Sequence, residues 1–125
     1  KTKNCFMTNI FDSPNRLIVD IDDTILTTHN RDYPNSVPHT DMIDKLNRMY
    51  DDGWVIIYHT ARGQLSNNGD IEKIEKNVRP ILEDWLARHN VKYHELIMGK
   101  PWGAYYIDDK AMKPDEFLSS NLEKQ

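Results

Sequence analysis

The residues most suited to chemistry are aspartates that follow two short apolar runs. Asp20, Asp22 and Asp23 end a run that begins at position 17, and Asp108 and Asp109 end another run near the C-terminus. Carboxylates this close repel one another, and aspartate is a poor strand residue, so the grouping needs an explanation. Hard oxygen ligands suit Mg²⁺, which keeps several waters and leaves positions for a phosphate oxygen. The aspartates predict a Mg²⁺ site at one place in the fold, and the metal predicts a phosphate ester as substrate.

The elements that must position these aspartates are strands that alternate with helices. Apolar runs predict the strands, amphipathic periodicity predicts the helices, and proline is expected to break a helix. The expected elements are strands at 17–21, 54–58, 95–98 and 104–107, a flap over 27–39, a helix over 40–51, a helical region over 70–90 whose main helix starts near 79 beside Pro80, and a short helix over 113–120.

This alternation predicts an α/β fold, a Rossmann-like three-layer sandwich with a mostly parallel sheet. Right-handed crossovers bring the carboxyl ends of parallel strands to one edge of the sheet, where sites of such folds lie. The polar residues that follow three of the strands are 20–23, 59–60 and 108–109. We therefore expect them to meet at one edge, although they lie far apart in the sequence.

Four motifs with this order resemble those of the haloacid dehalogenase-like phosphatases. They are "DIDDT" after an apolar strand, "VIIYHT" ending in Thr60, "GKP" containing Lys100, and "YYIDD" ending in Asp108 and Asp109. The resemblance covers residues 16–110. It implies that Asp20 is the nucleophile that forms an aspartyl phosphate, and that Asp22 is the general acid and then the general base.

The resemblance also implies how the phosphoryl group and the metal are held. Thr60 and Lys100 would bind the transferring phosphoryl group and offset its charge. The implied Mg²⁺ ligands are Asp20, the backbone carbonyl of Asp22, and Asp108, with Asp109 helping directly or through water. Because pumps of this family lack the second acid, its presence favours hydrolysis.

The spacing of the motifs leaves no room for a cap domain. The gaps 25–59 and 61–99 are filled by the expected flap, helices and strands. The chain therefore resembles the capless subgroup, whose open site must be closed by a macromolecular substrate, by the loop 63–70, or by a neighbouring subunit. A homo-oligomer is one expected way to close it.

The longer matches "HTARG", "GKPWG" and "YYIDDKAMKPDEF" resemble small bacterial proteins of capsule or other surface polysaccharide synthesis. The resemblance implies a small phosphorylated sugar, polyol or related metabolite as substrate. A sugar-activating nucleotidyltransferase would be a natural fused domain.

Other residues have both a functional and a structural interpretation. Arg62 could reach a substrate carboxylate or phosphate, or it could form a structural ion pair. Trp102 could stack on a sugar ring, although ordinary packing is the alternative. Asp23 is interpreted as exposed and structural. Residues considered for the rim or for substrate contact are His59 and, in the flap, His29, Arg31 and Tyr33.

Size and composition fit one soluble domain over residues 1–125, with 1–15 as a lead-in. The chain is 38% hydrophobic and 29% charged, which suits a packed core. A net charge of −4 without a basic block argues against nucleic acid or an anionic membrane as the main partner. The single cysteine and the lack of a long apolar run lead us to expect a cytoplasmic protein. A first residue other than Met is expected of an excised piece or a processed chain.

Three alternatives to a sugar phosphatase stay open. A polynucleotide 3′-phosphatase or a protein phosphatase would also use an open site, and the negative net charge argues against the former. A catalytically dead binding domain is disfavoured because all four motifs are complete.

Overall fold

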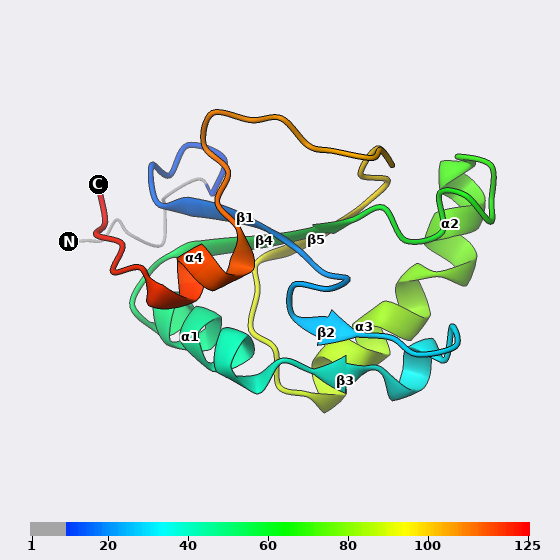
Figure 1. Ribbon diagram of the computed structural model, residues 1–125, viewed down its shortest axis with the longest axis horizontal. Helices are drawn as coiled ribbons and strands as arrows, with labels where there is room; N and C mark the ends of the chain where they lie inside the picture. The colour runs from blue at the N-terminus through cyan, green and yellow to red at the C-terminus, as the bar shows by residue number, and fades with distance from the viewer. Residues whose placement is uncertain (1–9) are drawn as a thin grey trace.

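The computed structural model describes residues 10–125. Strands and helices alternate along this part of the chain (Figure 1). In chain order they are β1 (Arg16–Asp20), β2 (Leu26–Thr27), the 3₁₀ helix η2 (Tyr33–Asn35), β3 (Val37–Pro38), α1 (Thr40–Asp51), β4 (Val55–Thr60), α2 (Ile71–Asn77), α3 (Arg79–Arg88), β5 (Glu95–Met98) and α4 (Pro114–Ser119).

The main sheet has the strand order β1-β4-β5, and both neighbouring pairs are parallel. Asp20 lies opposite His59, and Thr60 lies opposite Met98, so the three strands end at nearly the same level. The α/β fold with a parallel sheet, compatible with a Rossmann-like arrangement, is confirmed. The carboxyl ends of the three strands form one edge, as the sequence predicts.

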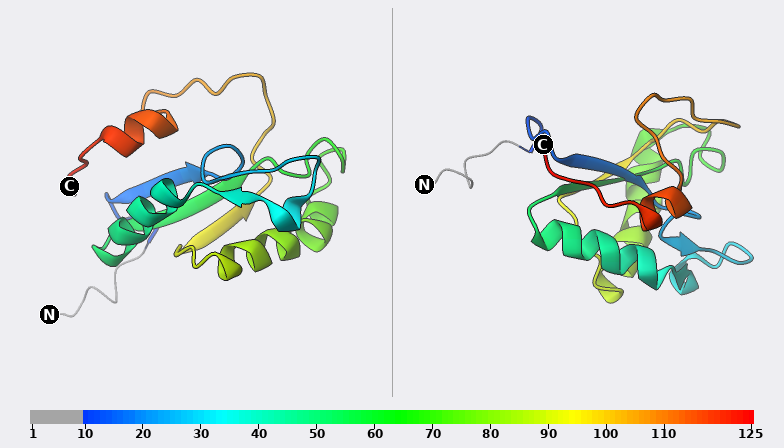
Figure 2. Two further views of the ribbon diagram at one scale, coloured as in Figure 1. Left: turned by 60° about the horizontal axis from the view of Figure 1, so that its bottom comes forward. Right: turned by 60° about the vertical axis from the view of Figure 1, so that its left-hand side comes forward.

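One face of this sheet carries the hydrophobic core. Figure 2 shows α1 and α3 on the same side of the sheet, as two right-handed crossovers in the same direction require. The core residues of the sheet are Ile56, Tyr58, Leu96 and Met98, which pack on apolar side chains of the helices. On the opposite face Ile18 is 52% and Ile97 is 41% exposed, although Ile57 between them is fully buried.

The predicted flap is a hairpin of β2 and β3 that is fixed to the body of the molecule. Its loop is held by a hydrogen bond between the hydroxyls of Thr28 and Ser36. Trp85 of α3 donates its indole N–H to the Ser36 carbonyl, and Arg88 donates to the Pro34 carbonyl. The flap residues therefore hold a defined position relative to α3.

The helical region breaks where the sequence predicts. The first helix, α2, ends at Asn77, and α3 begins at Arg79 with Pro80 in its first turn, where a missing N–H costs nothing. Near the C-terminus, Lys45 of α1 donates to backbone carbonyls at the end of α4, including that of Ser120. The final short helix is therefore held against α1.

The predicted strand at 104–107 is wrong, because this segment forms no strand. Tyr105 is 85% and Ile107 is 98% exposed, and no backbone–backbone hydrogen bond of the described chain involves residues 101–112. A strand requires a partner for its N–H and C=O groups, and here the segment has none.

Two other expectations concern the chain's first residues and membranes. Of the lead-in 1–15, residues 1–9, with Cys5, lie outside the described part of the chain, and residues 10–15 form no strand. Within residues 10–125, no helix has the length and apolar character needed to cross a bilayer.

Candidate active site

Asp20 ends β1 and is held from two sides. Its Oδ2 accepts a hydrogen bond from the Thr24 hydroxyl at 3.3 Å, and its Oδ1 lies 3.2 Å from the ammonium of Lys100. The Asp20 side chain is 36% exposed, whereas that of Lys100 is 11% exposed. The carboxylate is thus oriented by the protein and still reachable by a ligand, as a nucleophile must be.

Lys100 reaches this carboxylate because the chain turns sharply after β5. Gly99 has φ +88°, a conformation that favours glycine, and a Cβ there would lie 2.9 Å from Ile71 Cδ1. The backbone N–H of Lys100 then donates to the Thr60 carbonyl at 3.0 Å. The end of β5 is thereby tied to the end of β4, and Lys100 is placed over Asp20.

Asp22 has a different partner, the guanidinium of Arg62. Arg62 donates from Nη2 to Asp22 Oδ1 at 2.7 Å and from Nε to Oδ2 at 3.3 Å, a fork that fixes the carboxylate plane. The buried Thr60 hydroxyl also donates to Oδ2 at 3.3 Å and accepts the Arg62 backbone N–H at 3.0 Å. Residues at the end of β4 therefore position Asp22.

The two carboxylates thus have separate cationic partners from different strand ends. Asp20 is paired with the lysine after β5, and Asp22 with the arginine after β4. The expected like-charge repulsion is therefore offset by two cationic side chains of the chain itself.

His59 also lies at this rim, beside Asp20 in the register. The pKa of His59 is lowered, mainly by burial and less by the Lys100 ammonium, while the Asp20 carboxylate opposes this shift. A half-buried imidazole next to a lysine is thus disfavoured in its charged form.

The residues expected to complete a Mg²⁺ site lie elsewhere. Asp108 and Asp109 are exposed residues of the segment that forms no strand, and they interact with Lys110. Hydrogen bonds from the Lys110 backbone and from Asp109, with a smaller charge effect of Lys110, lower the pKa of Asp108. Within residues 10–125, no group of three or more acidic, histidine or cysteine side chains is arranged to hold a metal ion. In this arrangement the residues do not fit Mg²⁺.

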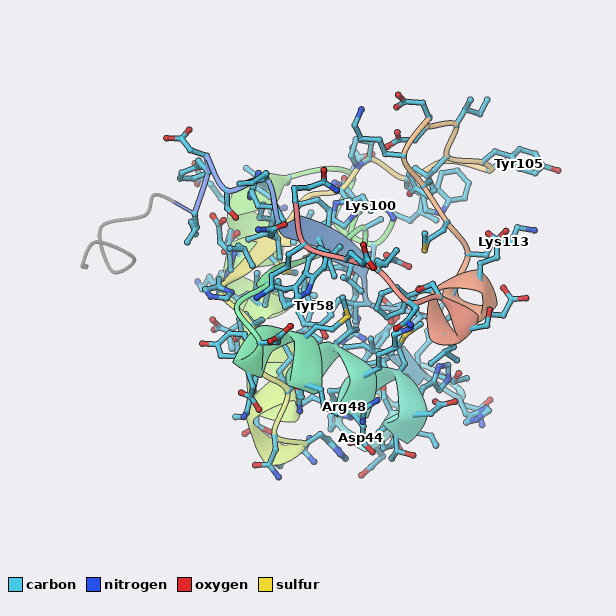
Figure 3. The ribbon with its side chains drawn as sticks, turned by 90° about the vertical axis from the view of Figure 1, so that its left-hand side faces the viewer. Asp44, Arg48, Tyr58, Lys100, Tyr105 and Lys113 are labelled. Carbon is cyan, nitrogen blue, oxygen red and sulfur yellow. The ribbon has the colours of Figure 1, made fainter. Side chains whose placement is uncertain are left out.

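Two further residues differ in how far they join the site. Arg62 is a buried part of it, and its observed partner is Asp22 rather than a ligand. Trp102 is 62% exposed and makes no hydrogen bond or ring contact with any other residue between 10 and 125. Figure 3 shows Tyr105, of the same segment, projecting away from the body of the molecule.

The sequence interpretation missed the role of one site residue, Thr24. Its hydroxyl orients Asp20, four positions earlier. The available signal was its place within "DIDDT", a motif that was interpreted mainly through its acids. Asp23, between them, is exposed and has φ 64°, which aspartate tolerates, so its structural interpretation agrees with its position.

Comparison with solved structures finds a protein that resembles this chain over most of the length of both. A structural genomics target from Vibrio cholerae is 40% identical to this chain, with a TM-score of 0.83 over 86% of this chain and 90% of that one. No protein-family model matches the sequence. No curated protein matches it either.

Two structures of an RNA repair complex show a more distant likeness. The Pnkp1/Rnl/Hen1 complex matches 86% of this chain at 22% identity and a TM-score of 0.55, with 35% of the other chain covered. A second structure of that RNA repair complex matches 85% of this chain at 20% identity and a TM-score of 0.53, with 30% of the other chain covered. At these identities the likeness concerns the fold alone.

Proposed function

We propose that this chain is a phosphomonoester hydrolase of the haloacid dehalogenase-like type. The chain belongs to the same family as the Vibrio cholerae protein. Its strand ends bring together an oriented Asp20 and an oriented Asp22. The observation that carries the proposal is this pair of carboxylates, each held by its own cation at one edge of a parallel sheet.

The reaction proceeds in two balanced displacements. An Asp20 carboxylate oxygen attacks phosphorus and the ester P–O bond breaks. Asp22 enters this step in its protonated form, which the second displacement restores, and gives its proton to the leaving alcohol oxygen. Water then attacks the aspartyl phosphate, Asp22 takes a proton from that water, and the P–O bond to Asp20 breaks to release phosphate.

Three neighbouring groups serve these steps. Thr24 orients the Asp20 carboxylate, and the Lys100 ammonium beside it offsets charge on the transferring phosphoryl oxygens. Arg62 and Thr60 hold the carboxylate of Asp22, which needs a fixed position to exchange protons with both the alcohol and the water.

Mg²⁺ stays a proposed cofactor. For Asp108 to act as a ligand, the segment 101–112 must leave its exposed arrangement and bring Asp108 to Asp20. Phosphoryl-transfer enzymes of this kind use such an ion to neutralise phosphate charge. Its binding would therefore be coupled to a movement of this segment.

The proposed substrate is a small phosphorylated sugar, polyol or related metabolite. Support comes from the sequence resemblance and from the negative net charge of −4, which disfavours polyanionic partners. The role in surface polysaccharide synthesis, a homo-oligomer, a fused nucleotidyltransferase and a cytoplasmic location stay predictions from the sequence.

The test is phosphate release from an aryl phosphate, with and without Mg²⁺, followed by a panel of sugar phosphates. We expect Asp20→Asn to lower turnover by at least about 10³-fold, because it removes the nucleophile. Asp44→Asn is the matched control, since Asp44 is an exposed residue of α1 without a hydrogen-bond or ion-pair partner in the described chain (Figure 3). Absence of release from every substrate, or equal release by both variants, would contradict the proposal.

A second candidate is a polynucleotide 3′-phosphatase, which the fold likeness to an RNA repair complex favours. Phosphate release from a 3′-phosphorylated oligonucleotide discriminates the two. The second candidate requires an affinity that falls steeply with salt, as phosphate-backbone contacts dictate. Faster phosphate release from sugar phosphates than from 3′-phosphorylated oligonucleotides of any length supports the first candidate.

A further inference from the structure

The molecule has a pocket beside Asp22 with two arginines in its wall. Its volume is about 230 Å³, and it is lined by Asp22, Asp23, Thr28, Arg31, Tyr33 and Arg62. Arg31 comes from the flap and Arg62 from the turn after β4, so two separate parts of the chain bring a guanidinium to the same space.

Arg62 has one nitrogen left over. The fork to Asp22 uses Nε and Nη2, whereas Nη1 is buried and has no hydrogen-bond partner within residues 10–125. Arg62 as a whole is only 8% exposed, and its guanidinium lies 4.5 Å from the centre of the Tyr33 ring, which restricts its movement. A buried donor of this kind loses free energy unless an acceptor reaches it.

Arg31 is a cation without a partner. It is exposed, and the described chain provides no hydrogen bond or ion pair for it. Its φ is 57° and that of Asn30 is 53°, a left-handed conformation that arginine rarely adopts and asparagine tolerates. The flap is fixed to α3 through Ser36, and Arg31 lines the pocket from the loop of this flap.

The pocket lies on the side of the site where a leaving group must be. In the proposed reaction Asp22 protonates the ester oxygen, so the atoms beyond that oxygen lie next to Asp22, away from Asp20. Of the two catalytic carboxylates proposed, Asp22 lines the pocket and Asp20 does not. The carboxylate of Asp23 also lines it, and this side chain is exposed to water.

From the unpaired nitrogen of Arg62, the unpartnered Arg31 and the position beside Asp22, we propose that this pocket binds a second anionic group of the substrate, carried by the leaving group. The chemistry fits either a carboxylate or a second phosphate, because guanidinium N–H groups donate to the oxygens of both, and Arg31 has its full set of donors free within the described chain. This inference rests on the proposed function for the place of the first phosphate. The substrate class then narrows from any phosphate ester to one whose alcohol part is itself negatively charged.

The test is calorimetric binding to the Asp20→Asn chain, which cannot turn over, with ligand pairs that differ by one anionic group. The first pair is 3-phosphoglycerate against glycerol 3-phosphate, which probes a carboxylate. The second is adenosine 3′,5′-bisphosphate against adenosine 3′-phosphate, which probes a phosphate. We expect about tenfold tighter binding of the more anionic member in at least one pair, about 1.4 kcal/mol, and the pair that shows it identifies the anion.

Arg31→Gln, added to Asp20→Asn, tests whether the pocket causes the preference. The preference should fall to about twofold or less in this variant. Arg48→Gln is the matched control with the same charge change, on an exposed arginine of α1 that does not line the pocket (Figure 3). It should keep the full preference.

Two results would overturn the inference. One is the absence of a preference in both ligand pairs, which includes no binding at all. The other is a preference that persists in Arg31→Gln. Failure of the proposed function looks different: the chain with Asp20 intact would bind with the preference but release no phosphate from either ligand.

Discussion

The rim of the sheet and the segment 101–112 hold the two halves of the predicted site, and they differ in how they are fixed. At the rim, Asp20 and Thr60 end hydrogen-bonded strands, whereas Asp22 and Lys100 come just after strand ends. Their side chains form two pairs, Asp20 with Lys100 and Asp22 with Thr60. In the segment, Asp108 and its neighbours are exposed and form no backbone–backbone hydrogen bond within the described chain. A motif at the end of an apolar run therefore predicts the position of its residues only where that run pairs with a neighbouring strand in the sheet.

The largest expected difference between the two regions is in turnover, when a lysine of each region is replaced. Lys100→Met removes the cation beside Asp20, so we expect phosphate release to fall by about 10²–10³-fold, as for loss of a group that offsets transition-state charge. Lys113→Met removes an exposed lysine just beyond the segment and should change turnover by less than about twofold. Steady-state kinetics on a common substrate measures both. Similar losses in the two variants would contradict the distinction.

A second contrast uses one glycine from each region. Gly99→Ala forces alanine into φ +88° and against Ile71, so we expect a loss of about 1–3 kcal/mol in the free energy of unfolding. Gly103→Ala meets only the Tyr105 carbonyl, at 3.6 Å, and its φ lies outside the left-handed region. That variant should be neutral, or more stable by up to about 1 kcal/mol through a less flexible unfolded chain. Urea unfolding of both variants decides the matter, and a larger cost at Gly103 would show that the segment is ordered.

These two regions also mark how far the sequence predicts the structure. The strands β1, β4 and β5 and the break at Pro80 follow from apolar runs and proline, which act locally. The segment 104–107 has the same apolar character, but a strand also needs a neighbour to bond with, and local pattern does not supply one. The pairing of Arg62 with Asp22 depends on the path of the turn after β4, and the sequence left it as one of two alternatives.

The third prediction concerns movement of the segment on metal binding. If Asp108 joins Asp20 at a Mg²⁺ ion, amides of residues 101–112 gain partners, and their hydrogen exchange should slow by about tenfold or more. The measurement compares exchange with and without Mg²⁺ and inorganic phosphate, and the Asp108→Asn variant should lose the protection. Amides of β4, already bonded to two neighbouring strands, should change little. Metal-dependent turnover without any protection of the segment would show that Asp108 is not a ligand.

The smallest expected effect is a pH dependence that belongs to the rim. The pKa of His59 is lowered in the folded chain by burial and by Lys100, so the unfolded chain binds a proton more readily. The contribution of a neutral His59 is therefore complete above its unfolded pKa of about 6.5 and is lost as pH falls below that value toward the folded pKa. His59→Gln should flatten the fall in unfolding free energy between about pH 7 and pH 5, because glutamine does not titrate. Residues 101–112 contain no histidine, so this pH dependence is not expected from that segment. If the pH dependence of the unfolding free energy is unchanged in His59→Gln, it comes from other histidines of the chain and not from the rim.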